Sequence, residues 1–308
     1  AQIAVNQRFA LFYPEKRPFF MEGVDLLQTP IDAVYTRAIT SPRWGLRATG
    51  KVGSVAYTVL TAQDRGGGSV IIPGSQYSEF APRDFGSLVT IARIRQDMGR
   101  SFWGFLVTDR ENQGGSYNRV AGPDFQWRPN ATDQLTGQFL YSITRTPGQP
   151  WNSPEWDGRK QSAGDLSLVY DHSAKTWRWN LQYKNVGADF RADSGFVPQV
   201  GYQEGRARLS YNFYPGNFFS RVEPAAIVEQ KWDRSGKPLQ RHVYAGLNVE
   251  GKRSLYSEVF FSSGEERVGD KLLRANAVWA GGSLSPSAVW SRLSAFALLG
   301  QQIDYAGA

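Results

Sequence analysis

The eight residues Trp177–Lys184, WRWNLQYK, alternate strictly between apolar and polar side chains. The apolar residues of this stretch are Trp177, Trp179, Leu181 and Tyr183, and the polar residues are Arg178, Asn180, Gln182 and Lys184. Successive side chains of an extended strand point to opposite faces, so a period of two residues predicts a β-strand with one apolar face.

The same period recurs along most of the chain. It is clear in Arg206–Phe213, in Leu135–Ile143 and in Val243–Val249. Further candidate strands are Ala33–Ile39, Trp44–Val52, Val55–Asp64, Ser87–Asp97, Phe102–Arg110, Tyr117–Trp127, Gly164–Asp171, Phe219–Trp232, Leu255–Ser262, Leu272–Gly281 and Ala288–Leu298. No comparable window has the 3.6-residue period of a helix. The sequence therefore predicts an all-β fold of about fifteen strands, in the range of about 14–16.

Strand and connection lengths favour a membrane barrel over a soluble sandwich. The predicted strands are about 8–13 residues long, whereas soluble strands cluster near five or six and bilayer-crossing strands need about 9–11. Tight turns, for example at Gly53 and at Met98–Arg100, alternate with longer connections such as Arg65–Phe85, Thr146–Lys160 and Ser263–Lys271. This rhythm is typical of an antiparallel up-and-down transmembrane β-barrel with short periplasmic turns and long extracellular loops.

The rhythm also predicts an orientation. With a periplasmic turn at Gly53, strand Ala33–Ile39 runs outward, which leaves Arg8–Gly23 on the periplasmic side. The last strand, Ala288–Leu298, then ends outside the cell. Because single-chain bacterial barrels have even strand numbers, an odd count predicts that residues 33–308 are part of a larger barrel, truncated at the C-terminus.

The stretch Arg8–Gly23, RFALFYPEKRPFFMEG, departs from the strand pattern. Pro14 and Pro18 fix φ and disfavour both a continuous helix and a central strand. Aromatic residues surround this charged, proline-rich centre. We interpret residues 1–32 as an irregular segment, either a simple cap on a core or a latch or plug at the mouth of a barrel.

This stretch also resembles the opening of an uncharacterised family of outer-membrane β-barrels, a domain of unknown function that commonly follows a family-nine carbohydrate-binding-like domain. The match runs nearly residue for residue, with Tyr13 and Met21 as mild substitutions. AVYTRAI at Ala33–Ile39, GLRATGKVG at Gly45–Gly53 and NRVAGPDF at Asn118–Phe125 follow in the family's order. The motif positions are Arg8, Phe9, Phe12, Pro14, Glu15, Lys16, Arg17, Pro18, Phe19, Phe20, Glu22 and Gly23. The resemblance implies an outer-membrane barrel in a Gram-negative bacterium, preceded by a periplasmic domain with a sugar-related role.

Composition sets further bounds. The chain has 308 residues and no cysteine, which excludes a disulfide framework and thiol chemistry. It contains no apolar run of 18 residues that would predict a transmembrane helix. The chain begins at Ala1 without a methionine or signal sequence, so we expect it to be a fragment of a longer protein.

The sequence offers no catalytic or metal-binding motif. His172 and His242 are far apart, and neither a nucleophile elbow, a phosphate-binding loop nor a zinc-protease motif is present. Asp189–Asp193 and Asp109–Asn112 could offer oxygens to calcium, but without the spacing of a known loop. Paired carboxylates for glycoside hydrolysis stay possible, since their separation is spatial. We expect no cofactor, no metal and no catalysis in this segment.

Two groups of residues are candidates for recognition. Most tryptophans suit the aromatic girdles of a barrel, but Trp151 and Trp156 lie in a long loop and could contact a partner such as an oligo- or polysaccharide. The net charge is +7, yet the basic residues are spread through strands, which argues against nucleic acid. Candidates for the lumen wall are Lys51, Arg93, Arg95, Arg178, Lys184, Arg206 and Arg208.

These cations admit two interpretations. They could make the lumen selective for anions or acidic polymers. Alternatively, acids such as Asp97, Asp124, Asp165 and Glu258 pair with them and give rigidity without selectivity. We therefore expect an outer-membrane barrel in contact with lipid, acting as a pore, transporter or surface-docking protein. The alternatives are a soluble all-β carbohydrate-binding or carbohydrate-active domain and a plugged structural scaffold.

Overall fold

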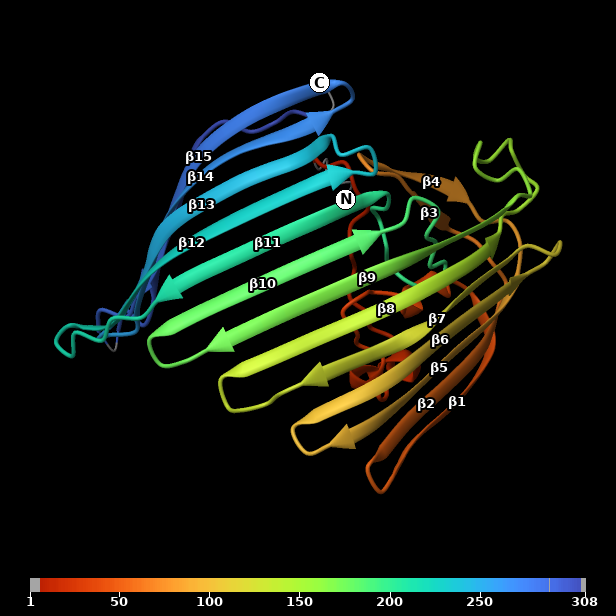
Figure 1. The fold of residues 1–308 in the computed structure, drawn as a ribbon, viewed down its shortest axis with the longest axis horizontal. Coiled ribbons are helices and arrows are strands. Elements are labelled where there is room, and N and C mark those ends of the chain that lie inside the picture. The colour runs from red at the N-terminus through yellow and green to blue at the C-terminus, as the bar shows by residue number, and fades with distance from the viewer. Residues whose placement is uncertain (1–5, 288, 306–308) are drawn as a thin grey trace.

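A computed structural model describes residues 6–287 and 289–305. One antiparallel sheet of 14 strands makes up most of the molecule, and β3 and β4 form a separate hairpin (Figure 1). The strands are β1 (Pro42–Val52), β2 (Val55–Asp64), β3 (Ser69–Pro73), β4 (Ser78–Pro82), β5 (Ser87–Met98), β6 (Ser101–Asn112), β7 (Tyr117–Trp127), β8 (Asp133–Arg145), β9 (Lys160–Ser173), β10 (Trp177–Val186), β11 (Tyr202–Tyr211), β12 (Phe219–Asp233), β13 (Pro238–Gly251), β14 (Leu255–Val268), β15 (Lys271–Leu284) and β16 (Leu293–Gly300). The all-β, up-and-down prediction is confirmed.

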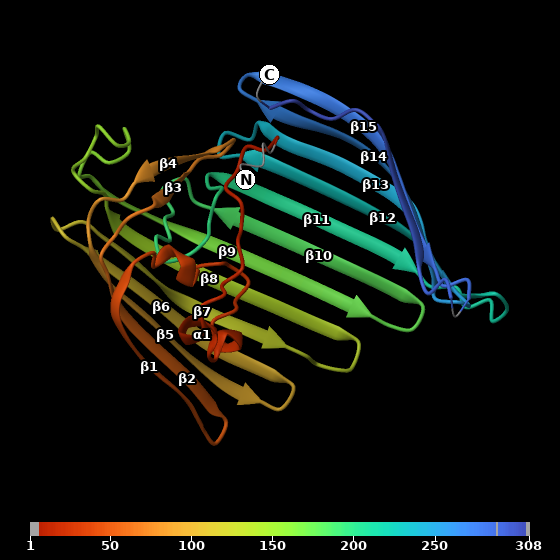
Figure 2. The ribbon, with the colours of Figure 1, turned by 180° about the vertical axis from the view of Figure 1, so that it is seen from behind.

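The large sheet is curved but open. Its strands follow one another in chain order from β1 to β16, with only the β3–β4 hairpin left out. Within the described residues β1 pairs with β2 alone and β16 with β15 alone, so both edges are free. Figure 1 and Figure 2 show a trough rather than a cylinder. The predicted strand type and order are therefore present, and a closed barrel is not.

The two faces of the trough differ in chemistry. Side chains on the concave face contact the N-terminal segment, as Leu60, Ile91 and Arg93 do. Strand register carries this face across the sheet, because Leu60 pairs with Ile91 and Ile91 with Thr108. Exposed apolar residues occupy the convex face, including Leu46, Val59, Ile94, Phe105, Phe125, Phe139, Leu181, Leu209, Val228, Val243, Phe261, Val278 and Leu299. Charged side chains of the strand centres lie on the concave face.

The N-terminal segment, residues 6–41, lies over the concave face (Figure 2). It contains the short helix α1 (Pro18–Met21) and two 3₁₀ turns, η1 (Val24–Leu26) and η2 (Thr36–Ala38). Phe20, Leu27 and Ile39 pack against Leu60, Ala62, Val89 and Ile91 in a buried cluster. Gly45 on β1 allows this approach, since a Cβ there would lie 3.0 Å from the Phe19 ring. We call residues 6–41 the re-entrant segment.

The path of this segment corrects the predicted orientation. Ala33–Ile39 is not a strand, because η2 replaces its second half and Arg17 hydrogen-bonds its carbonyl groups. β1 begins at Pro42 opposite Asp64, at the end of the sheet that carries the long connections. Arg8 also lies at that end, beside Glu266 near the β14–β15 turn. The segment thus enters the trough and returns to β1 at the same end. The outward strand from which the side of Arg8–Gly23 was predicted is absent, and Gly23 lies against Thr49 of β1 inside the trough.

The connections follow the predicted rhythm only in part. The long connection Arg65–Phe85 contains the β3–β4 hairpin, which periodicity missed. The predicted loop Ser263–Lys271 is wrong, because β14 runs to Val268 and β15 starts at Lys271. Some predictions fall partly outside the described residues. Residues 1–5 belong to the predicted segment 1–32, residue 288 begins the predicted strand Ala288–Leu298, and residues 306–308 end the predicted barrel domain 33–308. Among the residues that are described, no helix has the length and apolar character needed to cross a membrane.

Candidate functional site

All seven predicted basic residues lie on the concave face. Strand register places them on this face. Arg93 on β5 pairs with Thr58 on β2, and Arg206 on β11 pairs with Gln182 on β10. Lys51 and Arg95 lie near the short-turn end, where both contact Asp97: Lys51 Nζ is 2.8 Å from Oδ2 and Arg95 Nε is 2.9 Å from Oδ1. Arg93 and Asp124 form a fully buried pair.

Arg93 also ties the sheet to the re-entrant segment. Its guanidinium donates to the backbone carbonyl oxygens of Leu26 and Gln28, the latter at 3.1 Å. A buried arginine needs several acceptors to offset its lost hydration. Here the acceptors are one strand carboxylate and two carbonyls of the segment. The predicted lumen cation Arg93 is therefore a structural anchor.

Two further cations are paired and two are not. Arg206 lies 3.6 Å from Glu229 and Arg208 lies 3.2 Å from Glu223. Within the described part of the chain, Arg178 and Lys184 have no ion pair within 4 Å. Five of the seven candidates thus have carboxylate partners, as the second interpretation expects, although Glu258 accepts from Tyr256 Oη at 2.7 Å instead.

The Arg8–Gly23 motif is organised around Glu15. Its Oε1 accepts from the backbone N–H groups of Lys16 and Arg17, and Thr36 Oγ1 donates to Oε2 at 2.7 Å. Arg17 adds a fork, with Nε 3.0 Å from Oε1 and Nη2 2.8 Å from Oε2. Burial raises the pKa of the Glu15 carboxyl, but these hydrogen bonds outweigh it and lower the pKa to about 2.

Arg17 extends this motif to the end of the segment. Its guanidinium donates to the carbonyl oxygens of Ile39 at 2.7 Å and Thr36 at 2.8 Å, and lies 4.2 Å from the Phe20 ring centre. The two halves of the re-entrant segment are therefore held together by one arginine and one glutamate.

A buried ion cluster lies at the end of the trough that carries the long connections. Asp64 Oδ2 accepts from Arg83 at 2.9 Å and from Arg110 at 3.0 Å, and all three side chains are at most 3% exposed. Both arginines also donate to the Ala38 carbonyl oxygen. Burial lowers the pKa of Arg83, and Asp64 opposes that shift. The cluster joins the re-entrant segment, the β4 connection and the sheet.

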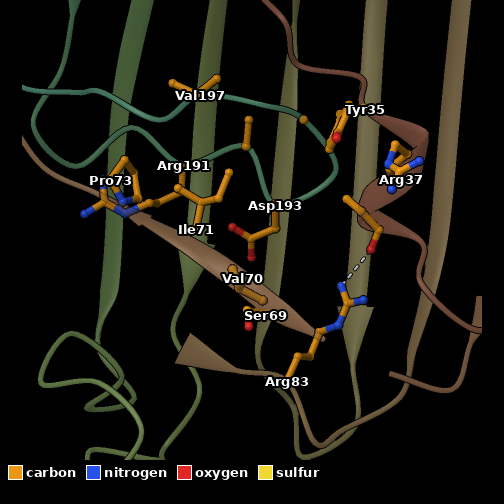
Figure 3. Close-up of a pocket in the computed structure, with 13 residues that line it drawn as sticks. Tyr35, Arg37, Ser69, Val70, Ile71, Pro73, Arg83, Arg191, Asp193 and Val197 are labelled. Atoms are coloured by element: carbon orange, nitrogen blue, oxygen red, sulfur yellow. Dashed lines mark hydrogen bonds between the residues drawn. The ribbon is translucent and has the colours of Figure 1, made fainter. Parts of the chain in front are cut away.

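Beside this cluster lies a cavity of about 90 Å³ (Figure 3). The Asp193 carboxylate points toward Val70 and Ser69 from the connection after β10. Burial raises the pKa of Asp193, opposed by Arg110 and Arg191. Arg191 is itself held by Glu155 through two hydrogen bonds of 2.7 and 2.6 Å. The sequence pointed to Asp193 only as a weak calcium candidate and missed Asp64, Arg83 and Arg110.

The two loop tryptophans have different environments. Trp156 is 4% exposed and packs with Ile72, Ala81 and Phe85, so its ring is part of a core under the β3–β4 hairpin. Trp151 is 74% exposed. Of the two predicted recognition residues, only Trp151 therefore presents its ring at the surface.

The histidines lie on opposite faces. His172 stacks on Trp179 at 3.8 Å and its Nδ1 is 2.7 Å from Asp133 on the convex side. His242 lies on the concave side, 3.5 Å from Glu266. The described residues contain no group of three or more histidines and carboxylates placed to hold a metal ion. Asp109, from the other weak calcium candidate, faces Arg119 at 3.4 Å on the convex side.

Comparison with known proteins finds no family model and no curated protein that matches this chain.

Proposed function

We propose that the 14-stranded sheet is the wall of an outer-membrane β-barrel whose convex face contacts lipid and whose concave face lines a lumen. The observation that carries this proposal is the placement of apolar side chains. Exposed Leu, Val, Ile and Phe residues cover the convex face, while charged side chains face inward. A transmembrane barrel has this arrangement, with apolar residues outward and polar residues inward.

The ends of the strands support the same proposal. Aromatic residues of the convex face lie toward the short turns at Trp103, Trp127, Trp177 and Trp179, and toward the other end at Trp44, Tyr141 and Trp232. Outward charges, such as the Arg119–Glu111 and Arg274–Glu265 pairs, lie near the long-connection end. Aromatic belts with charges beyond them are expected where a bilayer meets water.

The soluble alternative is disfavoured by curvature. A soluble sheet buries its apolar face against another layer. Here the re-entrant segment covers the concave face, where an apolar cluster lies beside the buried charged side chains (Figure 2). The convex face keeps a broad set of apolar side chains that no layer of the described chain covers. Residues such as Leu247 (39% exposed) and Phe261 (50% exposed) would be in water.

The re-entrant segment favours a lumen that is partly plugged. Phe20 fixes the segment to the concave face through burial, and Arg93 of the sheet fixes it through hydrogen bonds to Leu26 and Gln28. We propose a non-catalytic role in passage of a solute or in docking at the cell surface. The Arg8–Gly23 stretch resembles a family that follows carbohydrate-binding-like domains. An oligo- or polysaccharide is therefore the first solute to test, and an anionic solute is the second. A fixed segment with no passage would make the protein a plugged scaffold.

Single-cysteine variants provide a direct test, because the chain has no native cysteine. Val259 and Phe261 lie on the convex face of β14, and Ser262 lies on its concave face. We expect bimane attached at Val259→Cys or Phe261→Cys in native membranes to be quenched by nitroxide lipids. At Ser262→Cys we expect quenching by aqueous iodide and little by lipid. Equal quenching of all three by iodide alone would contradict a lipid-facing surface.

Membrane fractionation complements the labelling. We expect the protein to stay with outer membranes through urea and carbonate washes and to leave only with detergent. Its gel migration should change on heating, as is usual for stable barrels. Release into either wash would favour the soluble carbohydrate-binding alternative.

A further inference from the structure

A second cavity, of about 310 Å³, opens on the concave face between the re-entrant segment, the connection after β10 and strands β9–β12. Its floor is a cross-strand row. Ser167 pairs with Lys184, Lys184 with Glu204 and Glu204 with Lys231. Asp165 lies on the same face one step along β9, and Asp32 faces the cavity from the re-entrant segment.

The charges around this cavity do not balance. Lys231 is committed to Glu204 at 3.1 Å and to Gln199 Oε1 at 2.8 Å. Lys184 is close enough to Asp32 and Asp165 to attract both carboxyl groups. It forms an ion pair within 4 Å with neither of them. The cavity therefore holds three carboxyl groups, of Asp32, Asp165 and Glu204, against two lysines.

Asp165 is less well satisfied than Asp32. It is 4% exposed, and no described residue forms a hydrogen bond with its carboxylate. A buried carboxylate without partners is costly, whereas one that receives a hydrogen bond from a cation is stabilised. Asp32, on the segment, is exposed to the cavity. Burial within the trough nevertheless raises its pKa, and Lys184 opposes the shift.

The remaining walls are apolar and aromatic. Phe9 and Pro30 come from the re-entrant segment, Phe196 and Pro198 from the connection after β10, and Tyr202 from β11. The Lys231 ammonium lies 4.6 Å from the Tyr202 ring centre. Aromatic faces attract cations as well as apolar groups, and a volume near 300 Å³ is at the lower end for small-molecule sites.

We propose that this cavity binds a small organic cation, with its ammonium group between Asp165 and Asp32 and its apolar body against Phe9, Phe196 and Tyr202. This site is additional to the proposed membrane function and does not depend on the membrane location. The ammonium group donates to the Asp165 carboxylate, which has no other donor. Lys184 competes electrostatically for the same two carboxylates.

The test uses three probes that share a phenyl ring on a short chain and differ in the charge of their end group. They are phenethylammonium (positive), 2-phenylethanol (neutral) and phenylacetate (negative). Calorimetry on the full chain in detergent should show binding of phenethylammonium and binding at least tenfold weaker for the other two. Asp165→Asn and Asp32→Asn should each weaken phenethylammonium about tenfold or more. Lys184→Gln should strengthen it several-fold, because it removes the competing charge.

Asp171→Asn is the matched control, since Asp171 lies on the same face of β9 but outside this cavity and accepts from Asn180. It should leave phenethylammonium affinity unchanged. The opposite effects of changing Asp165 and Lys184 separate binding from misfolding, which would weaken all variants alike. Equal affinity for the cation and the alcohol, or weaker binding in Lys184→Gln, would overturn the proposal.

Discussion

Arg8 Nη2 donates to Glu266 Oε2 at 2.6 Å, which joins the start of the re-entrant segment to β14 across 258 positions of sequence. Arg8 Nη1 adds a bond of 2.7 Å to the Arg267 carbonyl oxygen, and Tyr305 Oη donates to the same glutamate oxygen at 2.8 Å. The other end of the segment continues into β1. The segment therefore spans the trough from its β14 side to its β1 edge.

This relationship predicts how the segment can be loosened. Arg8→Gln removes charge-assisted hydrogen bonds worth about 1.5–3 kcal/mol to one end of the segment. We expect faster hydrogen exchange of the amides in residues 8–16, with the strands of the sheet unchanged. Arg37→Gln is the matched control, because exposed Arg37 contacts the same stretch weakly, through a 3.4 Å bond to the Pro14 carbonyl oxygen and a 5.8 Å approach to the Tyr13 ring centre. Equal exchange in both variants would show that Arg8 is not an anchor.

The ion cluster at Asp64 predicts a large loss of stability. Asp64→Asn removes the carboxylate that forms ion pairs with the buried guanidinium groups of Arg83 and Arg110, and loss of one partner from a buried pair costs about 3–5 kcal/mol. Asp97→Asn is the control, since its partners Lys51 and Arg95 are 56% and 26% exposed and solvent-accessible pairs contribute about 0–1 kcal/mol each. Unfolding in detergent by guanidinium chloride measures both. Similar midpoints for the two variants would contradict a structural role for the cluster.

Glu15 predicts a pH dependence of the re-entrant segment. Its folded pKa of about 2 lies below the ordinary value of 4.5, so its contribution to stability is complete above about pH 4.5 and is lost as pH falls toward 2. We expect the stability difference between the native protein and Glu15→Gln to shrink over this range. Hydrogen exchange of residues 15–20 at pH 5 and pH 3 measures it. A difference that is independent of pH would contradict the assignment.

The sequence predicted the strands well because their signal is local. Alternation over Trp177–Lys184 matches β10 in both type and face, and the predicted lumen cations all lie on the concave side. Side-chain direction follows from the two-residue period alone. No other packing information was needed to separate the two faces.

Long-range contacts could not be predicted in the same way. Ala33–Ile39 contains the strand formers Val34, Tyr35 and Ile39. Bonds from Arg17 to Thr36 and Ile39 nevertheless hold it in an irregular path. Asp64, Arg83 and Arg110 meet only after the segment is folded into the trough. Trp156 looked like a loop tryptophan, because the sequence does not reveal that the β3–β4 hairpin covers it. Closure at the edges likewise depends on pairing between strands distant in sequence.

The concave charges give the last prediction, on ion selectivity. Arg206 and Arg208 face the proposed lumen beside Glu229 and Glu223. Reversing both, in Arg206→Glu and Arg208→Glu together, places four carboxylates close together, so the field in the lumen becomes strongly negative. In planar bilayers with a salt gradient we expect the reversal potential to move toward that of the cation.

Arg241→Glu serves as the control for this measurement, because Arg241 is on the convex face of β13 near the long connections. It should leave the reversal potential unchanged. The same potential in the double variant and in the native protein would contradict a lumen lined by the concave face. Arg8→Gln loosens the segment, so it should open a path for ions if the segment alone blocks the lumen. If neither the native protein nor Arg8→Gln conducts, the result would favour a plugged scaffold.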